Sequence, residues 1–399
     1  MRTAPLVVAA SLLITTGCGQ ANSPPNSQPP NAQGQSPAFE QQTRAPAINS
    51  SVKLEQHVIL DGLKHPWALA FLPDGQLLVT ERPGRLMRVS PSGQATEVSG
   101  VPEVMAQRQG GLLDVTLHPA FSDNRIIYLS YAEPRGRGRN GTSVMRARLA
   151  DDGGSLTDQR VVFRQRPAWE SGLHFGSRLV WDNDNRLFVT LGERGHEKPR
   201  QLAQSLQTHL GKVVRINDDG SVPTDNPFTD RDGARPEIWS YGHRNLQGAA
   251  IHPQTRQLWT MEHGPRGGDE LNTPQPGLNY GWPVITYGED YSGEPIGQGI
   301  TAREGMQQPR YYWDPVIAPG GMAFCADNCP SAWRGNLLIS SLNPGGVVRL
   351  ALEGDRVTGE ERLLTGLGRV RDLDFGPDGN LWLVTDSGNG KLLRFSPAQ

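Results

Sequence analysis

The feature that most constrains the fold of this chain is a segment near its start that returns near its end. WALAFLPDGQLLVTERPGRLMRV begins at Trp67, and VRDLDFGPDGNLWLVTDSGNGKLLRFS begins at Val370. In both segments apolar and polar residues alternate, and Pro-Asp-Gly separates the first run from the second. Such alternation between turn residues is typical of antiparallel β-strands.

Weaker copies of the same pattern fill the chain between these two, so that we expect six in all. They begin at Gly111, Gly176, Gly248 and Gly321. One unit of this size cannot bury both of its faces, whereas radial stacking of several units can. The pattern therefore predicts an all-β fold, a six-bladed β-propeller; a β-sandwich with accidental similarity is the alternative. The uneven spacing predicts long loops on the ligand-binding face.

Composition agrees with many short strands and excludes one class of partner. The 399 residues include 47 glycines and 32 prolines, as expected where turns are frequent. The formal net charge of −2 gives no reason to expect a nucleic-acid partner.

The N-terminal region divides into two expected segments ahead of the propeller. Residues 1–18 predict a signal peptide of lipoprotein type, because an apolar run from Leu6 to Ile14 precedes small residues and Cys18. A plain signal peptide cut elsewhere is the alternative. Residues 19–50 are rich in Pro, Asn, Gln and Ser and predict a disordered tether, which leaves 51–399 for the propeller. We expect an exported protein in the periplasm or cell envelope, anchored to a membrane surface by lipid on Cys18.

Cys325 and Cys329 are the other two cysteines of the chain. In an exported protein a small-loop disulfide is the expected pairing. A metal pair is the alternative, although no second Cys or His pair stands nearby.

The stretch from Trp239 to Pro283 carries the residue types of a binding site. It offers Arg244-Asn245 and then a glycine-rich loop that ends in Asp269-Glu270. A guanidinium suits a carboxylate or an oxyanion, and acids behind such a loop suit a hard cation such as calcium. An ordinary hairpin with a polar loop is the alternative.

Five motifs, in order along the chain, resemble those of a known family. They are QGGLLDVTLHP, HFGSRLVW, YGHRNLQG, GPRGGDELN with NYGWP, and GRVRDLDFGPDGNLWLVTD. From about Val52 to Phe395 the chain is similar to the soluble pyrroloquinoline-quinone (PQQ)-dependent glucose and aldose sugar dehydrogenases, which are six-bladed propellers. The resemblance implies oxidation of an aldose at C1 to a lactone, with PQQ and Ca²⁺ as cofactors and an external electron acceptor.

The resemblance also implies the two catalytic residues. His174 falls on the catalytic histidine, which would take the proton of the anomeric hydroxyl while hydride passes to C5 of the quinone. Arg244 falls on the arginine beside the quinone oxygens, where negative charge develops. A histidine at the start of a strand has structural roles as well, and these stay open for His174.

Further matches imply the cofactor site. Gln109 and Asn245 fall on residues that contact the cofactor, as Arg244 does. Arg369 and Arg371 fall on two arginines that hold cofactor carboxylates, and their alternation along one strand places both side chains on the same face. A solvated strand face is the alternative for this pair.

Two calcium sites are implied in the same way. Gly264 and Pro265 match backbone-carbonyl ligands of the ion that bridges to the cofactor. Glu270, Tyr280 and Asp290 match a second, structural site.

Three positions depart from the glucose enzymes of this family. Leu173 stands where they carry an acid and Asn343 where they carry a lysine, and a threonine contact of theirs falls near Val316. These changes put the cofactor affinity and the sugar preference in question. The loops are shorter as well, which suggests an open site that accepts several aldoses.

Two other functions fit a propeller of this kind. One is a calcium-dependent lactonase, and the other is a non-catalytic envelope propeller that binds sugars or proteins. The sequence allows a monomer or a dimer.

Overall fold

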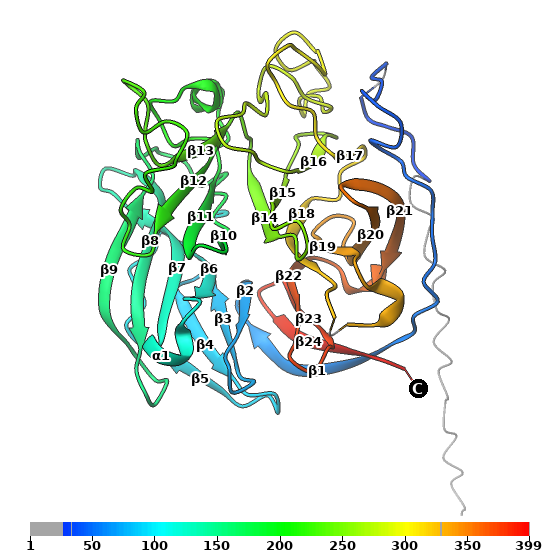
Figure 1. The fold of residues 1–399 in the computed structure, drawn as a ribbon. Coiled ribbons are helices and arrows are strands. Elements are labelled where there is room, and N and C mark those ends of the chain that lie inside the picture. The colour runs from blue at the N-terminus through cyan, green and yellow to red at the C-terminus, as the bar shows by residue number, and fades with distance from the viewer. Residues whose placement is uncertain (1–26, 33, 328, 399) are drawn as a thin grey trace, which may run out of the picture.

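A computed structural model describes residues 27–32, 34–327 and 329–398. In that part of the chain, 24 strands form six four-stranded antiparallel sheets around one axis (Figure 1). This arrangement confirms the predicted six-bladed β-propeller. Each of the six sequence copies begins within three residues of the first residue of a blade's innermost strand, so one copy of the repeat corresponds to one blade.

The first five blades each use four consecutive strands, with the innermost strand first. Their bounds are β2 (Pro66–Phe71), β3 (Leu77–Glu81), β4 (Arg85–Val89), β5 (Ala95–Val98); β6 (Leu112–Leu117), β7 (Ile126–Pro134), β8 (Asn140–Leu149), β9 (Leu156–Arg164); β10 (Leu179–Trp181), β11 (Arg186–Leu191), β12 (Lys212–Asn217), β13 (Ile238–Tyr241); β14 (Leu246–Ile251), β15 (Leu258–Glu262), β16 (Asp269–Asn272), β17 (Tyr311–Trp313); β18 (Pro319–Phe324), β19 (Leu337–Ser341), β20 (Val347–Glu353), β21 (Arg356–Leu363).

The sixth blade joins the two ends of the propeller. It consists of β22 (Val370–Phe375), β23 (Leu381–Thr385) and β24 (Gly390–Pro397), with β1 (Leu54–Leu63) as its outermost strand. β1 pairs antiparallel with β24, from Leu54 opposite Pro397 to Leu63 opposite Gly390. Hydrogen bonds between the first and last strands of the chain therefore close the ring of six blades.

Helices contribute little to this fold. They are α1 (Phe121–Asn124), α2 (Glu197–Gln201), η1 (Leu202–Gln204), η2 (Ser331–Trp333) and η3 (Thr365–Leu367). In the described part of the chain, no helix has the length and apolar character needed to cross a membrane.

The blades are held together by apolar packing and by buried hydroxyls on their second strands. Leu78 of β3 and Leu129 of β7 lie in one core between the first two blades, both fully buried, and each such leucine stabilises the fold by roughly 2 kcal/mol. Thr190 of β11 accepts from Arg178 N (2.9 Å) and donates to Leu246 O of the next blade (3.0 Å). Thr80 and Ser130 bridge the earlier blades in the same way. Serine or threonine at this position thus satisfies backbone groups that the ring would otherwise leave unpaired.

The described part of the expected tether differs from the prediction. Ala32 and residues 34–48 lie against the fourth and fifth blades, at the outer edge of the propeller (Figure 1). Gln42 is fully buried, donating to Pro309 O (3.0 Å), and Ala47 forms a bridge with Glu360. The composition argument was wrong here because amide and backbone hydrogen bonds, rather than apolar side chains, hold the segment.

Two other predictions concern the cysteines. Cys325 and Cys329 form the predicted disulfide, in the loop after β18. The signal peptide and Cys18 lie outside the described residues.

Candidate active site

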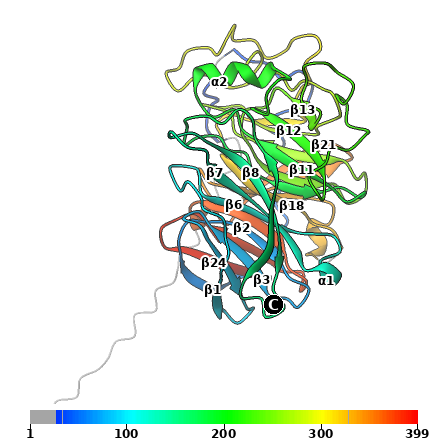
Figure 2. The same cartoon turned by 90° about the vertical axis from the view of Figure 1, so that its left-hand side faces the viewer.

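The propeller brings the predicted site residues to one end of its axis. All six innermost strands run in the same direction, so the segments that lead into them meet at one face. His174 precedes β10, Arg244 and Asn245 precede β14, and Arg369 precedes β22. The long segment between β16 and β17 rises at this same end, as does α2 (Figure 2).

His174 is buried and pairs with a carboxylate that the sequence did not single out. Its Nδ1 lies 2.7 Å from Glu193 Oε2, and the Glu193 side chain is almost fully buried. Burial lowers the pKa of His174 against the opposing pull of Glu193, while the imidazole and Arg244 hold the pKa of Glu193 below its usual value in spite of burial. A neutral imidazole beside an ionised carboxylate must donate from Nδ1, which leaves the lone pair on Nε2.

The backbone at His174 is strained and tightly enclosed. Its φ of 45° lies in the left-handed region that few non-glycine residues adopt. A Cβ on Gly192 would come within 2.2 Å of His174 O, so only glycine fits there. Arg194 donates to the same carbonyl (3.2 Å), and its guanidinium lies over the Phe175 ring at 3.7 Å. These contacts fix the imidazole in one place.

Gln109 and Asn245, the two predicted cofactor-binding amides, flank the His174 segment. Gln109 Oε1 accepts from His174 N (2.8 Å), and Asn245 Oδ1 accepts from Gly176 N (3.1 Å). The two amide groups therefore come from different blades and meet around one loop.

Arg244 contacts the glycine-rich loop that was predicted to hold calcium. Its Nη1 donates to His263 O (2.9 Å) and Gly264 O (2.8 Å), and its buried Nε has no hydrogen-bond partner. The loop is fastened by Asp269, which accepts from Gly264 N, Ile317 N and Ala318 N at 2.7 to 2.8 Å. Arg244 and the Gly264 carbonyl are thus held together at the end of the axis.

Arg369 and Arg371 meet on one acidic residue, Asp386. Asp386 Oδ2 lies 3.0 Å from an Nη2 of each arginine. Burial would raise the pKa of Asp386, but Arg371 and the surrounding donors hold that pKa well below its usual range. Arg371 is buried and also donates to Gln247 (2.6 Å), whereas half of the Arg369 side chain is exposed. The alternative of a solvated strand face is therefore excluded for Arg371.

Of the three residues matched to a second calcium site, the structure brings two together. Glu270 and Tyr280 line a small buried cavity with Glu262. Burial and the neighbouring Glu262 raise the pKa of Glu270 well above its ordinary value. Asp290 lies elsewhere, beside Arg200 at 3.7 Å. It belongs to the long segment between β16 and β17, where sequence matching does not fix the position of a side chain.

The positions that depart from the glucose enzymes also lie around this end of the axis. Leu173 is half-buried and packs close to Gly195, and Val316 is half-buried in the segment before β18. Asn343 is exposed, next to Leu342, whose carbonyl oxygen accepts from Arg369 (3.5 Å).

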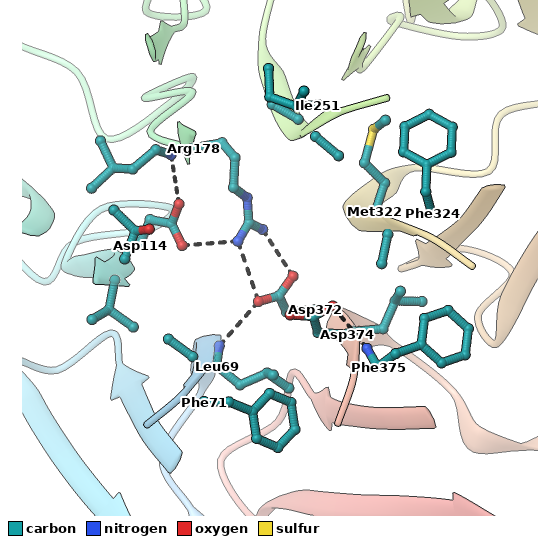
Figure 3. Close-up of a pocket in the computed structure, with 18 of the residues that line it drawn as sticks. Leu69, Phe71, Asp114, Arg178, Ile251, Met322, Phe324, Asp372, Asp374 and Phe375 are labelled. Atoms are coloured by element: carbon teal, nitrogen blue, oxygen red, sulfur yellow. Dashed lines mark hydrogen bonds and ion pairs between the residues drawn. The ribbon is translucent and has the colours of Figure 1, made fainter. Parts of the chain in front are cut away.

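A separate cavity of about 680 Å³ opens at the other end of the axis. It is lined by the far ends of the innermost strands, including Phe71 and Phe375 (Figure 3). At its base Arg178 lies between Asp114 (2.9 Å) and Asp372 (3.2 Å). This buried ion cluster joins three blades and belongs to the axial core, while the catalytic candidates face the opposite end.

The fold and this geometry define a class: a six-bladed propeller with a buried histidine–glutamate pair and several arginines at one end of its axis. The sequence profile described as glucose/sorbosone dehydrogenase matches residues 63–394. The chain belongs to that family.

Three relatives illustrate the similarity. Aldose sugar dehydrogenase YliI of Escherichia coli K12 is 48% identical over 357 residues, covering 88% of this chain and 94% of the relative. The soluble aldose sugar dehydrogenase of Escherichia coli in its apo form aligns with a TM-score of 0.84 at 46% identity, over 87% and 100% of the two chains. The PQQ-bound aldose sugar dehydrogenase of Streptomyces coelicolor aligns with a TM-score of 0.71 at 29% identity, over 88% and 100%.

Sequence reasoning missed Glu193, Asp386 and Asp269. A pattern in the sequence could have identified Glu193 and Asp386. Glu193 and Asp386 follow the second strand of their repeats, and the other repeats carry Glu81 and Glu262 at the end of that strand. Because this strand ends at the site face, an acid there in several copies marks groups that can reach the axis. Asp269 was noted only as part of the acidic end of the glycine-rich loop, and two of its three backbone partners, Ile317 and Ala318, are distant in sequence.

Proposed function

We propose that this protein is a PQQ- and calcium-dependent dehydrogenase that oxidises aldose sugars at C1 to lactones and passes electrons to an external acceptor. The observation that carries the proposal is the His174–Glu193 pair, at 2.7 Å, at the same end of the axis as Arg244, Arg369 and Arg371. An oriented neutral imidazole is a suitable base, and the arginines suit a polycarboxylate that develops further negative charge. The PQQ-bound relative and the aldose sugar dehydrogenase relatives support the choice of cofactor and substrate.

In this proposal the residues of the site have separate roles in the reaction. Nε2 of His174 takes the proton of the sugar's C1 hydroxyl, and Glu193 stabilises the imidazolium that forms. When bound, the quinone supplies the hydride acceptor that the protein itself lacks. Arg244 would stabilise negative charge on the oxygens of that acceptor, and Arg369 with Arg371 would neutralise its carboxylates.

Calcium fits two places, according to the donors present. Near Arg244, the loop of Gly264 and Pro265 offers backbone carbonyls, which are ligands of a hard cation. Glu270 and Glu262 form a buried acidic pair, and the buried Asn272 Oδ1 beside them has no hydrogen-bond partner. Two adjacent buried carboxylates are costly unless a cation balances them. Among the described residues, no three His, Cys, Asp or Glu side chains converge on one point, so carbonyl oxygens would complete either site.

Reconstitution tests the proposal. Purified apo-protein is mixed with PQQ, with calcium, with both or with neither, and an aldose is added. Bleaching of the quinone absorption and dye-linked turnover are expected only with both additions, with lactone as the product, and His174→Ala should abolish both signals. Lactone hydrolysis with calcium alone would favour the lactonase. Sugar binding without turnover with any acceptor would favour a binding propeller.

We also propose export and lipid anchoring at Cys18, supported by the apolar run before it. Labelling with a fatty-acid analogue in a bacterial host should mark the wild-type chain but not Cys18→Ala. Equal labelling of both would exclude this anchor.

A further inference from the structure

Arg82, in the turn between β3 and β4, lies at the candidate site although no motif pointed to it. Its Nη2 is 3.7 Å from Asp386 Oδ1, the carboxylate that also holds Arg369 and Arg371. Its Nη1 donates to Arg108 O, next to the Gln109 that binds the His174 backbone. The guanidinium therefore lies between the basic pair and the catalytic histidine.

The charges around Arg82 leave positive charge uncompensated. Three guanidiniums share Asp386, and His65 Nδ1 contacts the same carboxylate at 3.1 Å. The neighbouring Glu81 does not balance them, because it is paired with Arg85. Arg82 Nε is buried without a hydrogen-bond partner. A cluster of this kind is costly in the empty protein and is relieved by an anion of several charges.

The extra positive charge of Arg82 stands near a position at which the resemblance implies a cation and this chain has none. Asn343, where the resemblance puts a cofactor-contacting lysine, stands next to the segment that contacts Arg369 and brings no charge. Arg82 approaches Asp386 from a different blade. It therefore adds a third cation to Arg369 and Arg371, in place of the lysine that the resemblance puts at Asn343.

We propose that Arg82 is a cofactor-binding residue that contacts a carboxylate of the quinone, the third guanidinium of that site. This inference rests on the proposed function. The Arg82 backbone has a separate structural role, because its carbonyl accepts from Leu112 N (3.0 Å). That bond survives replacement of the side chain, so Arg82→Ala should fold.

The test measures equilibrium binding of PQQ to the full apo-protein in the presence of calcium, by titration calorimetry. Arg82→Ala should raise the Kd about tenfold or more, as expected for loss of a hydrogen bond between charged groups. Arg82→Lys should recover part of the affinity. Arg85→Ala is the matched control, because it removes the same charge three residues further on, at the start of β4, but from a side chain paired with Glu81; its Kd should stay within about twofold.

A second ligand separates contact from structure. The trimethyl ester of PQQ keeps the quinone but lacks the charged carboxylates, so wild type and Arg82→Ala should bind it equally. Equal losses for PQQ and its ester, or a Kd of Arg82→Ala within twofold of wild type, would overturn the assignment. If wild type itself fails to bind PQQ, the proposed function falls together with this inference; failure of the Arg82 variants alone to respond removes only the latter.

Discussion

His174 and Glu193 form a buried hydrogen bond of 2.7 Å, although the two residues are 19 positions apart in sequence, with strands β10 and β11 between them. Glu193 is held in turn by Gly195 N at 2.5 Å. The carboxylate keeps the proton of the neutral imidazole on Nδ1, so that Nε2 has a free lone pair and can accept a proton.

Replacing the Glu193 carboxylate should slow catalysis while the sugar and PQQ still bind. Glu193→Gln is expected to lower kcat roughly a hundredfold or more, because the amide neither fixes the tautomer nor stabilises the imidazolium. KM and PQQ affinity should change little. Glu237→Gln is the control, since Glu237 pairs with His209 (3.3 Å) away from the axis. Similar losses of kcat in both variants would show that Glu193 acts only through stability.

The pH dependence follows from the lowered pKa of His174. Burial keeps the imidazole neutral, so the rate of sugar oxidation should stay level down through the ordinary histidine value of about 6.5 and fall only below it. In Glu193→Gln the fall should move to still lower pH, because the carboxylate raises the pKa of His174. Stability should behave likewise: the unfolded imidazole takes up its proton first, so the free energy of unfolding declines below about pH 6.5. Stopped-flow reduction and thermal unfolding across pH measure the two effects; an acid limb above 6.5 would contradict the assignment.

Arg369 and Arg371, the two arginines of the proposed cofactor site, should contribute unequally to PQQ binding. Arg371 has a side chain that is 9% exposed and is fixed by Gln247 and Asp386, whereas the Arg369 side chain is 51% exposed. A desolvated, oriented guanidinium binds an anion more strongly than a hydrated one. Arg371→Gln should therefore weaken PQQ binding more than Arg369→Gln does. The reverse order in calorimetry would mean that the exposed side chain carries the contact.

The tight approach at Gly192 gives a steric test. Gly192→Ala should displace the His174 backbone, because the added Cβ would lie 2.2 Å from its carbonyl oxygen. We expect a loss of kcat of about tenfold or more together with lower stability. Gly366→Ala is the control, since nothing lies within 4 Å of a Cβ there and its φ is not positive. Unchanged kinetics in Gly192→Ala would show that the loop around His174 yields easily.

Calcium should act through Glu270. In wild type, calcium is expected to raise Tm, because a ligand that binds only the folded state stabilises it. In Glu270→Gln the calcium-dependent rise should shrink, while the metal-free Tm should hold or increase because one buried acid is removed. Asp290→Asn is the informative comparison, since Asp290 lies by Arg200 and should leave the calcium response intact. A larger effect of Asp290→Asn would restore the set of three that the sequence suggested.

The repeat was enough to predict the propeller. Period-two alternation and recurring turns are local properties, and six such units have few ways to bury their faces other than as a ring. The same locality explains the success with Cys325 and Cys329, four residues apart. It explains the failure before Ser50 too: Gln42 bonds to Tyr287, Gln308 and Pro309, at least 245 residues away, and local composition does not report such partners.

Sequence by itself determined which residues lead into or begin the innermost strands, and therefore that His174, Arg244 and Arg371 come to the same end of the axis. Only the tertiary structure decided how their charges are balanced. The carboxylates of Glu193 and Asp386 and the guanidinium of Arg82 arrive from other strands and other blades. Electrostatic interactions depend on distance and burial, and these exist only once the ring has closed.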